Sequence, residues 1–63
     1  MDRIRVKLSD KSVVTCDYAS EIRINDKVLT YLDGSHKPEE RLTFPIVNVL
    51  SYQVRDSWDR RPW

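Results

Sequence analysis

The side chains suited to covalent or acid–base chemistry are few in this sequence. Cys16 is the only cysteine and His36 the only histidine, so a thiol activated by an imidazole is the first arrangement to consider. Cys16 falls within an alternation of apolar and polar residues that predicts a strand, whereas His36 falls in a segment typical of a loop. Catalysis needs the two groups within hydrogen-bond reach. We therefore interpret Cys16 as a small buried hydrophobe rather than a nucleophile.

The other ingredients of an enzyme or metal site are also missing from the pattern. The acidic residues fall mostly in expected turns, and Gly34 is the only glycine, so no glycine-rich loop can cradle a phosphate. One cysteine and one histidine cannot supply the four ligands of a structural zinc site. A chain of 63 residues must fill its interior with its own side chains. We therefore expect no enzyme activity, no catalytic, metal or cofactor site, and no small-molecule substrate.

Basic and aromatic residues suggest a different chemistry, the binding of nucleic acid. Eleven Lys and Arg against ten Asp and Glu leave a net charge of +1, so any such binding must come from a local patch rather than a long-range field. Arginine–phosphate contacts with stacking on Trp58 would be the mechanism. Asp17 and Glu21 could neutralise the same sheet face by cross-strand pairing. The candidate nucleic-acid-binding residues are Arg3, Arg5, Lys7, Arg23, Arg60 and Arg61.

The elements that would position these side chains are short antiparallel strands. Ile4, Val6 and Leu8 alternate with basic residues, which is the period-2 signature of a half-buried strand. The next strand should place Val14, Cys16 and Tyr18 together on its more apolar face. Residues 19–21 interrupt the pattern and are either a short loop or a bulge that bends one long strand. The expected strands are 3–8, 13–18, 22–24, 28–32, 41–44 and a last one ending near 55, with hairpin turns at 9–12 and 25–27.

The remaining segments predict a loop, a turn and a tail. Residues 33–40 hold the only glycine and a proline and show no periodicity, so they form an exposed loop. Pro45 must end its strand or lie on an edge, because it lacks a donor for the ladder, and a short 3-10 turn should follow it up to Asn48. In the last strand, the residues expected inward are Val49 or Leu50, then Tyr52 and Val54.

Together these elements predict an all-β fold, a small antiparallel meander or barrel of five to six strands with a short 3-10 turn before the last strand. The strand spacing and the proline-containing turn resemble those of the SH3-like small barrels over about residues 3–55. This resemblance implies a shape and no activity. We expect one domain at residues 1–55, followed by an aromatic and basic C-terminal tail at residues 56–63.

Binding to protein is the function that the pattern favours. The expected core is thin and has neither a disulfide nor a metal to support it. The strand at residues 28–32 is apolar on both faces, as expected for a strand in a subunit contact or covered on two sides. The tail tryptophans are costly to leave in water, and they either fold back on the domain or dock on a partner. The predicted partner-binding residues are Trp58, Trp63, Tyr31 and Leu29.

The leading hypothesis is thus a non-enzymatic interaction module that self-associates or binds another protein, as an adaptor, inhibitor or assembly component. Nucleic-acid binding is the alternative. The first residues lack the apolar run of a signal peptide, and no run approaches the roughly 18 apolar residues of a membrane span. We therefore expect a cytoplasmic protein with no membrane partner, and its size suggests a phage or bacterial protein.

Overall fold

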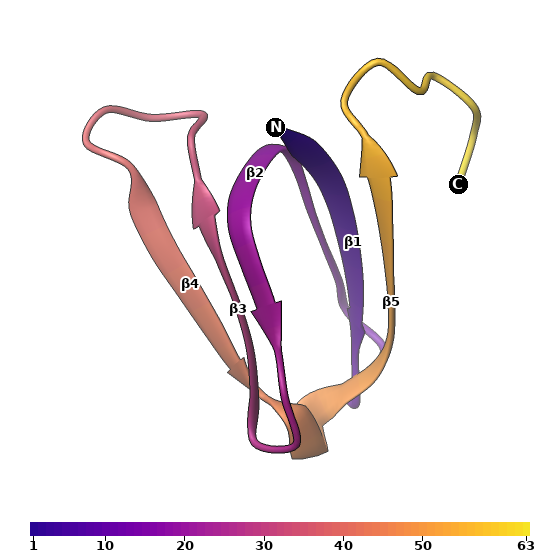
Figure 1. Ribbon diagram of the computed structural model, residues 1–63. Coiled ribbons are helices and arrows are strands. Elements are labelled where there is room, and N and C mark those ends of the chain that lie inside the picture. The colour runs from indigo at the N-terminus through magenta and orange to yellow at the C-terminus, as the bar shows by residue number, and fades with distance from the viewer.

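Five antiparallel strands form one sheet in the computed structural model, which describes all 63 residues (Figure 1). The strand order is β4-β3-β2-β1-β5, so the predicted all-β antiparallel class is confirmed. A 3-10 turn, η1, carries the chain from one edge strand to the other across one end of the sheet. No helix has the length and apolar character needed to cross a membrane. The elements are β1 (Asp2–Leu8), β2 (Val13–Ile24), β3 (Val28–Asp33), β4 (Glu40–Pro45), η1 (Ile46–Asn48) and β5 (Val49–Asp56).

The first hairpin follows directly from the alternation in the sequence. Ile4 and Val6 are fully buried, and Arg5 between them points to the opposite face because successive side chains of a strand alternate. The turn is held by Asp10, whose carboxylate accepts hydrogen bonds from the backbone and the hydroxyl group of Ser12. These bonds favour the charged carboxylate and hold the pKa of Asp10 below its usual range. The predicted hairpin turn is therefore confirmed.

Strand β2 differs from the expectation because a bulge changes which residues face the core. Its register with β1 shifts between the partners of Asp2 and Ile4, so the strand carries one extra residue there. Beyond this point Tyr18 is turned outward and is 53% exposed, while Ala19 is fully buried. The prediction that Tyr18 shares the inner face of Cys16 is therefore wrong. A one-residue insertion moves every later side chain to the other face.

A second irregularity settles the interruption at residues 19–21. The register with β3 shifts between Ser20 and Arg23, and Glu21 has a φ of 49°, in the left-handed region that a non-glycine residue rarely adopts. The chain is bent here without leaving the sheet, so β2 continues for 12 residues. The interruption is a bulge, and the two short strands expected at 13–18 and 22–24 are one strand. The sheet consequently has five strands rather than six.

The core is thin and lies on one face of the curved sheet. The inner strand β3 contributes Leu29 and Tyr31, which are both fully buried. Phe44 of β4 stacks on Tyr31, with the two ring centroids 6.3 Å apart. Strand β4 therefore covers one side of the Tyr31 ring. Partly buried side chains from β4, η1 and β5 surround the centre. The buried apolar residues are Ile4, Val6, Cys16, Ala19, Leu29 and Tyr31.

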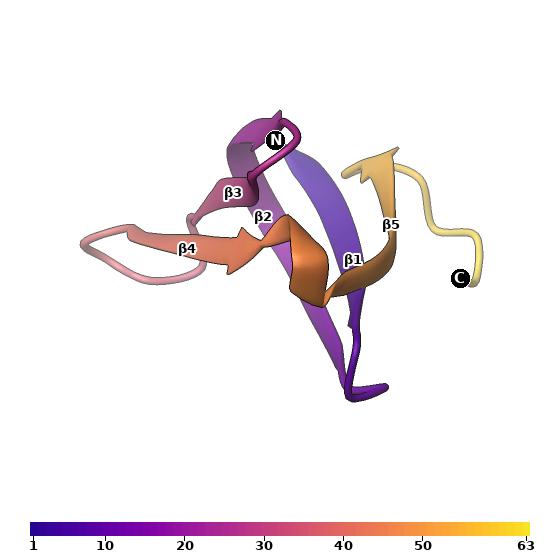
Figure 2. The same ribbon diagram turned by 90° about the horizontal axis from the view of Figure 1, so that it is seen from below.

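The sheet is curved but has two free edges. Strand β4 pairs only with β3, and β5 pairs only with β1, so no ladder joins β4 to β5. Figure 2 shows η1 between these two edge strands. Pro45 ends β4 as predicted, and the backbone amide of Ile46 donates to the carbonyl of Lys27 at 2.8 Å. That bond ties the connection to the β2–β3 hairpin and fixes the path by which the chain reaches β5.

Candidate functional site

The structure places the thiol and the imidazole in different environments. Cys16 lies in β2 with its side chain in the core and 6% of its surface exposed. Burial raises the pKa of the Cys16 thiol, which disfavours the nucleophilic thiolate. His36 is exposed in the loop between β3 and β4. No hydrogen bond joins the two side chains, and no group of three or more histidine, cysteine or acidic residues is placed to hold a metal ion.

Two of the predicted partner-binding residues belong to the core. Leu29 and Tyr31 are both 0% exposed, because β3 is an inner strand and points these side chains toward the buried face. The Tyr31 hydroxyl is enclosed without a hydrogen-bond partner, and burial raises the pKa of Tyr31 to about 12. Neither side chain reaches the surface, so a partner-binding surface on this chain has to be built from other residues.

The two tail tryptophans, equivalent in sequence terms, have different environments. The indole of Trp58 is 76% exposed. Trp63 is half-buried, with the guanidinium carbon of Arg3 at 4.9 Å and that of Arg55 at 4.8 Å from its ring centroid. Both distances are typical of cation–π contacts. Trp63 therefore folds back on the domain, whereas Trp58 remains available to a partner.

Backbone carbonyls of the tail reinforce this fold-back. The Nη1 group of Arg55 donates to the carbonyl oxygens of Arg61 and Pro62, each at 2.9 Å. Arg3 Nη1 donates to the carbonyl of Asp59, and the Nε of Arg3 lies 3.5 Å from a carboxylate oxygen of Asp17. Arg3 and Arg55 thus hold the tail against the outer face of β1 and β5, the face away from the core.

Asp59 is a structural residue that sequence reasoning missed. It is 8% exposed and is the one buried charged residue of the chain. Its carboxylate accepts hydrogen bonds from the backbone and the guanidinium of Arg61, with Nη2 at 2.7 Å from Oδ2. These bonds hold the pKa of the Asp59 carboxyl well below its usual range. No local pattern marks Asp59, because its burial depends on the tail packing on strands that are distant in sequence.

An exposed apolar row follows β5 on the face that carries the core. Tyr52 pairs with Val6 and Val54 pairs with Ile4, and paired residues share a face of the sheet. The β1 partners are fully buried, yet Tyr52 is 46% and Val54 43% exposed. Leu50, which lies at the register shift between the partners of Lys7 and Leu8 and has no partner on β1, is 58% exposed. Of the two alternatives predicted at the start of the strand, Val49 packs against the core and Leu50 does not. Tyr52 and Val54 lie on the predicted face, but no further strand covers them because β5 is the edge.

The two free edges differ in how far they resist pairing with another strand. Strand β4 begins with the charged Glu40 and Arg41 and ends in Pro45, and charge and proline are features that block strand addition. Strand β5 has no proline, glycine or charged residue between Val49 and Val54. Its eight residues exceed the length of a typical protected edge strand. Its register with β1 shifts between Val49 and Ser51, so a bulge lies at the start of the strand. From Ser51 onward the β5 edge is the one open to a partner strand.

The predicted basic residues fall into separate groups. Arg3, Arg5 and Lys7 follow one another along the outer face of β1. Arg23 lies beyond the second bulge of β2, opposite Thr30, and does not join them. In the tail, the guanidinium of Arg61 forms an ion pair with the carboxylate of Asp59. The outer-face pairs across β5, β1 and β2 are Arg55–Arg3, Gln53–Arg5, Arg5–Thr15, Ser51–Lys7 and Lys7–Val13.

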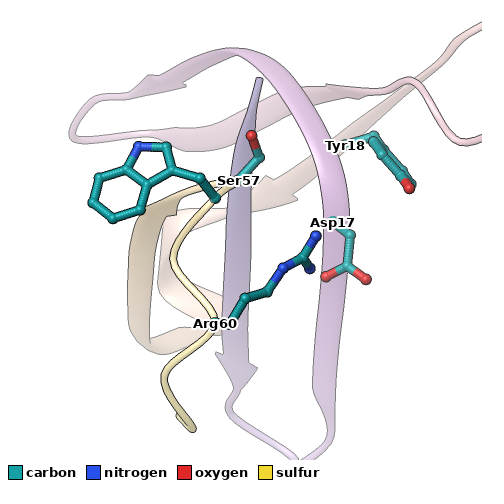
Figure 3. Close-up of a pocket in the computed structure, with 5 residues that line it drawn as sticks. Asp17, Tyr18, Ser57 and Arg60 are labelled. Carbon is teal, nitrogen blue, oxygen red and sulfur yellow. The ribbon is translucent and has the colours of Figure 1, made fainter.

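Arg60 takes a position that connects the tail with this face. Figure 3 shows its guanidinium pointing from the tail across β1 toward Asp17 on β2, while Tyr18 points away. Together with Ser57 and Trp58 these residues line a shallow hollow of about 230 Å³. A second hollow, of about 410 Å³, is lined by tail residues 58–61 alone. Both are open surface features bordered by the exposed Trp58 indole.

Comparison with family models, with curated proteins and with solved structures found no match to this chain. The fold and the surfaces define a small antiparallel β-sheet protein with a free apolar edge strand, β5, and a basic outer face on β1. Any function must therefore be inferred from the chemistry of these two surfaces.

Proposed function

We propose that this chain is a non-enzymatic protein-interaction module that self-associates through the free edge of β5. The observation that carries the proposal is the exposed apolar row of Leu50, Tyr52 and Val54 on an edge strand that lacks any protective proline, glycine or charge. Only seven of 63 residues are buried, so covering this row would add substantially to a thin core.

A two-fold axis through Tyr52 gives the simplest pairing. Two copies of β5 placed antiparallel about that axis bring Tyr52 opposite its counterpart and Leu50 opposite Val54 of the second copy. On the other face Ser51 meets Gln53, so no like charges oppose each other along the row. The main-chain groups on the free side of β5 would then form a continuous sheet across the two copies.

An SH3-like small barrel, left open between β4 and β5, is the fold type that we propose for this module. The order β4-β3-β2-β1-β5 and the 3-10 turn before the last strand support it. A cytoplasmic location is part of the same proposal, and the single buried thiol of Cys16 is compatible with a reducing compartment.

The solution mass over a range of protein concentrations, measured by light scattering on a sizing column, tests the self-association. We expect a concentration-dependent dimer for the unaltered chain. The Tyr52→Lys variant should be monomeric, because it places two ammonium groups opposite each other at the two-fold axis.

Val47→Lys is the matched control. Val47 is 84% exposed, but it lies in η1 rather than on the β5 edge, so this variant should dimerise like the unaltered chain. A monomer at every concentration, or equal dissociation of the two lysine variants, would refute the β5 interface.

A further inference from the structure

The outer face of β1 carries a row of cations. Alternate residues of a strand are about 7 Å apart on one face, so Arg3, Arg5 and Lys7 form a line along β1. Arg55 lies beside Arg3 on β5. A line of evenly spaced cations complements a polymer with one negative charge per repeat better than it complements a compact anion.

The acidic residues expected to neutralise this face leave two of these cations without an ion-pair partner. Asp17 interacts with Arg3 at 3.5 Å, and Glu21 interacts with Arg41 of β4 at 3.6 Å. Arg5 is flanked by Gln53 and Thr15, and Lys7 by Ser51 and Val13. Neither Arg5 nor Lys7 takes part in an ion pair, and Lys7 is exposed. These two cations are therefore available to an external anion.

The tail adds a stacking surface to the same side of the molecule. Trp58 is 76% exposed and borders the hollow that Arg60 and Asp17 line. Arg60 reaches over β1 toward Asp17 on β2 (Figure 3), and it lines the same hollow as Trp58. A flat, exposed aromatic ring next to cations is the combination that holds an unpaired base and its phosphate.

We infer that the outer face of β1, with Arg60 and Trp58 of the tail, binds single-stranded nucleic acid without sequence specificity. Phosphates contact Arg5, Lys7 and Arg60, and a base stacks on Trp58. A duplex would match this surface poorly, because its bases are already stacked on one another and cannot reach the indole. The binding face is distinct from the β5 edge, so this inference does not depend on self-association.

Fluorescence anisotropy with a labelled oligothymidylate of about 12 nucleotides tests the inference, since this length lies within the range bound by one small β-barrel. Binding should weaken with salt, and the double variant Arg5→Gln with Lys7→Gln should reduce the slope of log affinity against log salt by about 1.4. Trp58→Ala should weaken binding about tenfold, as expected for the loss of one stacked base.

The double variant Arg23→Gln with Lys27→Gln is the charge-matched control, because Arg23 lies beyond the second bulge and Lys27 in the β2–β3 turn. It should retain the slope of the unaltered chain. Far-UV circular dichroism establishes that each variant is folded. Three outcomes would overturn the inference: affinity that does not depend on salt, equal losses in the two double variants, or equally tight binding of polyglutamate, which would indicate an acidic protein as the ligand.

Discussion

The guanidinium carbon of Arg3 lies 4.9 Å from the ring centroid of Trp63, and Arg55 approaches the same ring from the neighbouring strand at 4.8 Å. The two arginines are paired across β1 and β5, where like charges would repel each other. The electron-rich face of the indole and the tail carbonyls offset this repulsion. The tail thus stabilises a pairing that the sheet alone would disfavour.

Replacing Trp63 by alanine should therefore lower the free energy of unfolding by about 1 kcal/mol, the scale of a cation–π contact with some desolvation. The measurement is urea denaturation followed by far-UV circular dichroism. Trp58→Ala removes the same side chain from a position that is 76% exposed, and it should change stability by less than about 0.5 kcal/mol. Equal losses in the two variants would show that Trp63 is not anchored by the arginine pair.

The buried Tyr31 hydroxyl gives a prediction of opposite sign. It has no hydrogen-bond partner, and an enclosed unsatisfied polar group costs about 1 to 3 kcal/mol. Tyr31→Phe keeps the ring against Phe44 and removes the hydroxyl, so we expect the variant to be more stable by about 1 kcal/mol. Thermal and urea denaturation of the two proteins measure this. Tyr31→Ala, which leaves a cavity, should destabilise the protein by about 3 kcal/mol or more.

The same residue should make the protein sensitive to alkali. Burial raises the pKa of Tyr31 to about 12 from 10.0, so folding favours the neutral phenol. This preference for the neutral phenol stabilises the folded protein fully below pH 10, and the stabilisation is lost as pH rises through 12. Unfolding experiments between these pH values should show a decline in stability that is smaller in Tyr31→Phe. An identical decline in both proteins would assign the effect to other groups.

The Asp59 carboxylate should make the tail sensitive to acid. Its pKa lies well below the usual range because Arg61 donates hydrogen bonds to the charged form. A lowered pKa in the folded state gives stability that is present above about pH 4, the ordinary aspartate value, and is lost as pH falls toward the folded value. Trp63 fluorescence, recorded in a Trp58→Phe background, should report release of the tail on acidification.

Asp59→Asn provides the control for the acid transition. The amide keeps the size of the side chain but cannot titrate, so the tail signal of this variant should be nearly constant with pH over the acid range. A transition that persists unchanged in Asp59→Asn would mean that another carboxylate controls the tail.

Local pattern predicted much of this fold because strand alternation and turn chemistry act over a few residues. The burial of Ile4 and Val6 follows from period-2 spacing, and Asp10 closes its turn through a bond to a residue two positions away. The 3-10 turn after Pro45 was predicted on the same basis. The alternation predicts the wrong face for Tyr18, because the first bulge of β2 depends on how this strand pairs with β1 and, unlike the interruption at residues 19–21, leaves no sign in the periodicity.

The candidate surfaces were less accessible to prediction. The sequence offers no distinction between Trp58 and Trp63, and only the positions of Arg3 and Arg55 distinguish the half-buried ring of Trp63 from the exposed ring of Trp58. The sequence predicts partner contacts for Tyr31 and Leu29, because the residues of β3 do not reveal that the strand order makes it an inner strand. Conversely, the sequence predicts the face on which Tyr52 and Val54 lie, but it does not predict that both side chains are exposed.

The sequence by itself determined the class of the protein: antiparallel strands, hairpin turns at the expected places, and a thin core without an intramolecular disulfide. These properties arise from neighbouring residues and from composition. Only the tertiary structure decided which strand is an edge, which acidic residues neutralise which cations, and which tryptophan faces solvent. Those properties depend on contacts between residues far apart in the chain, and their geometry is fixed by the order and register of the strands.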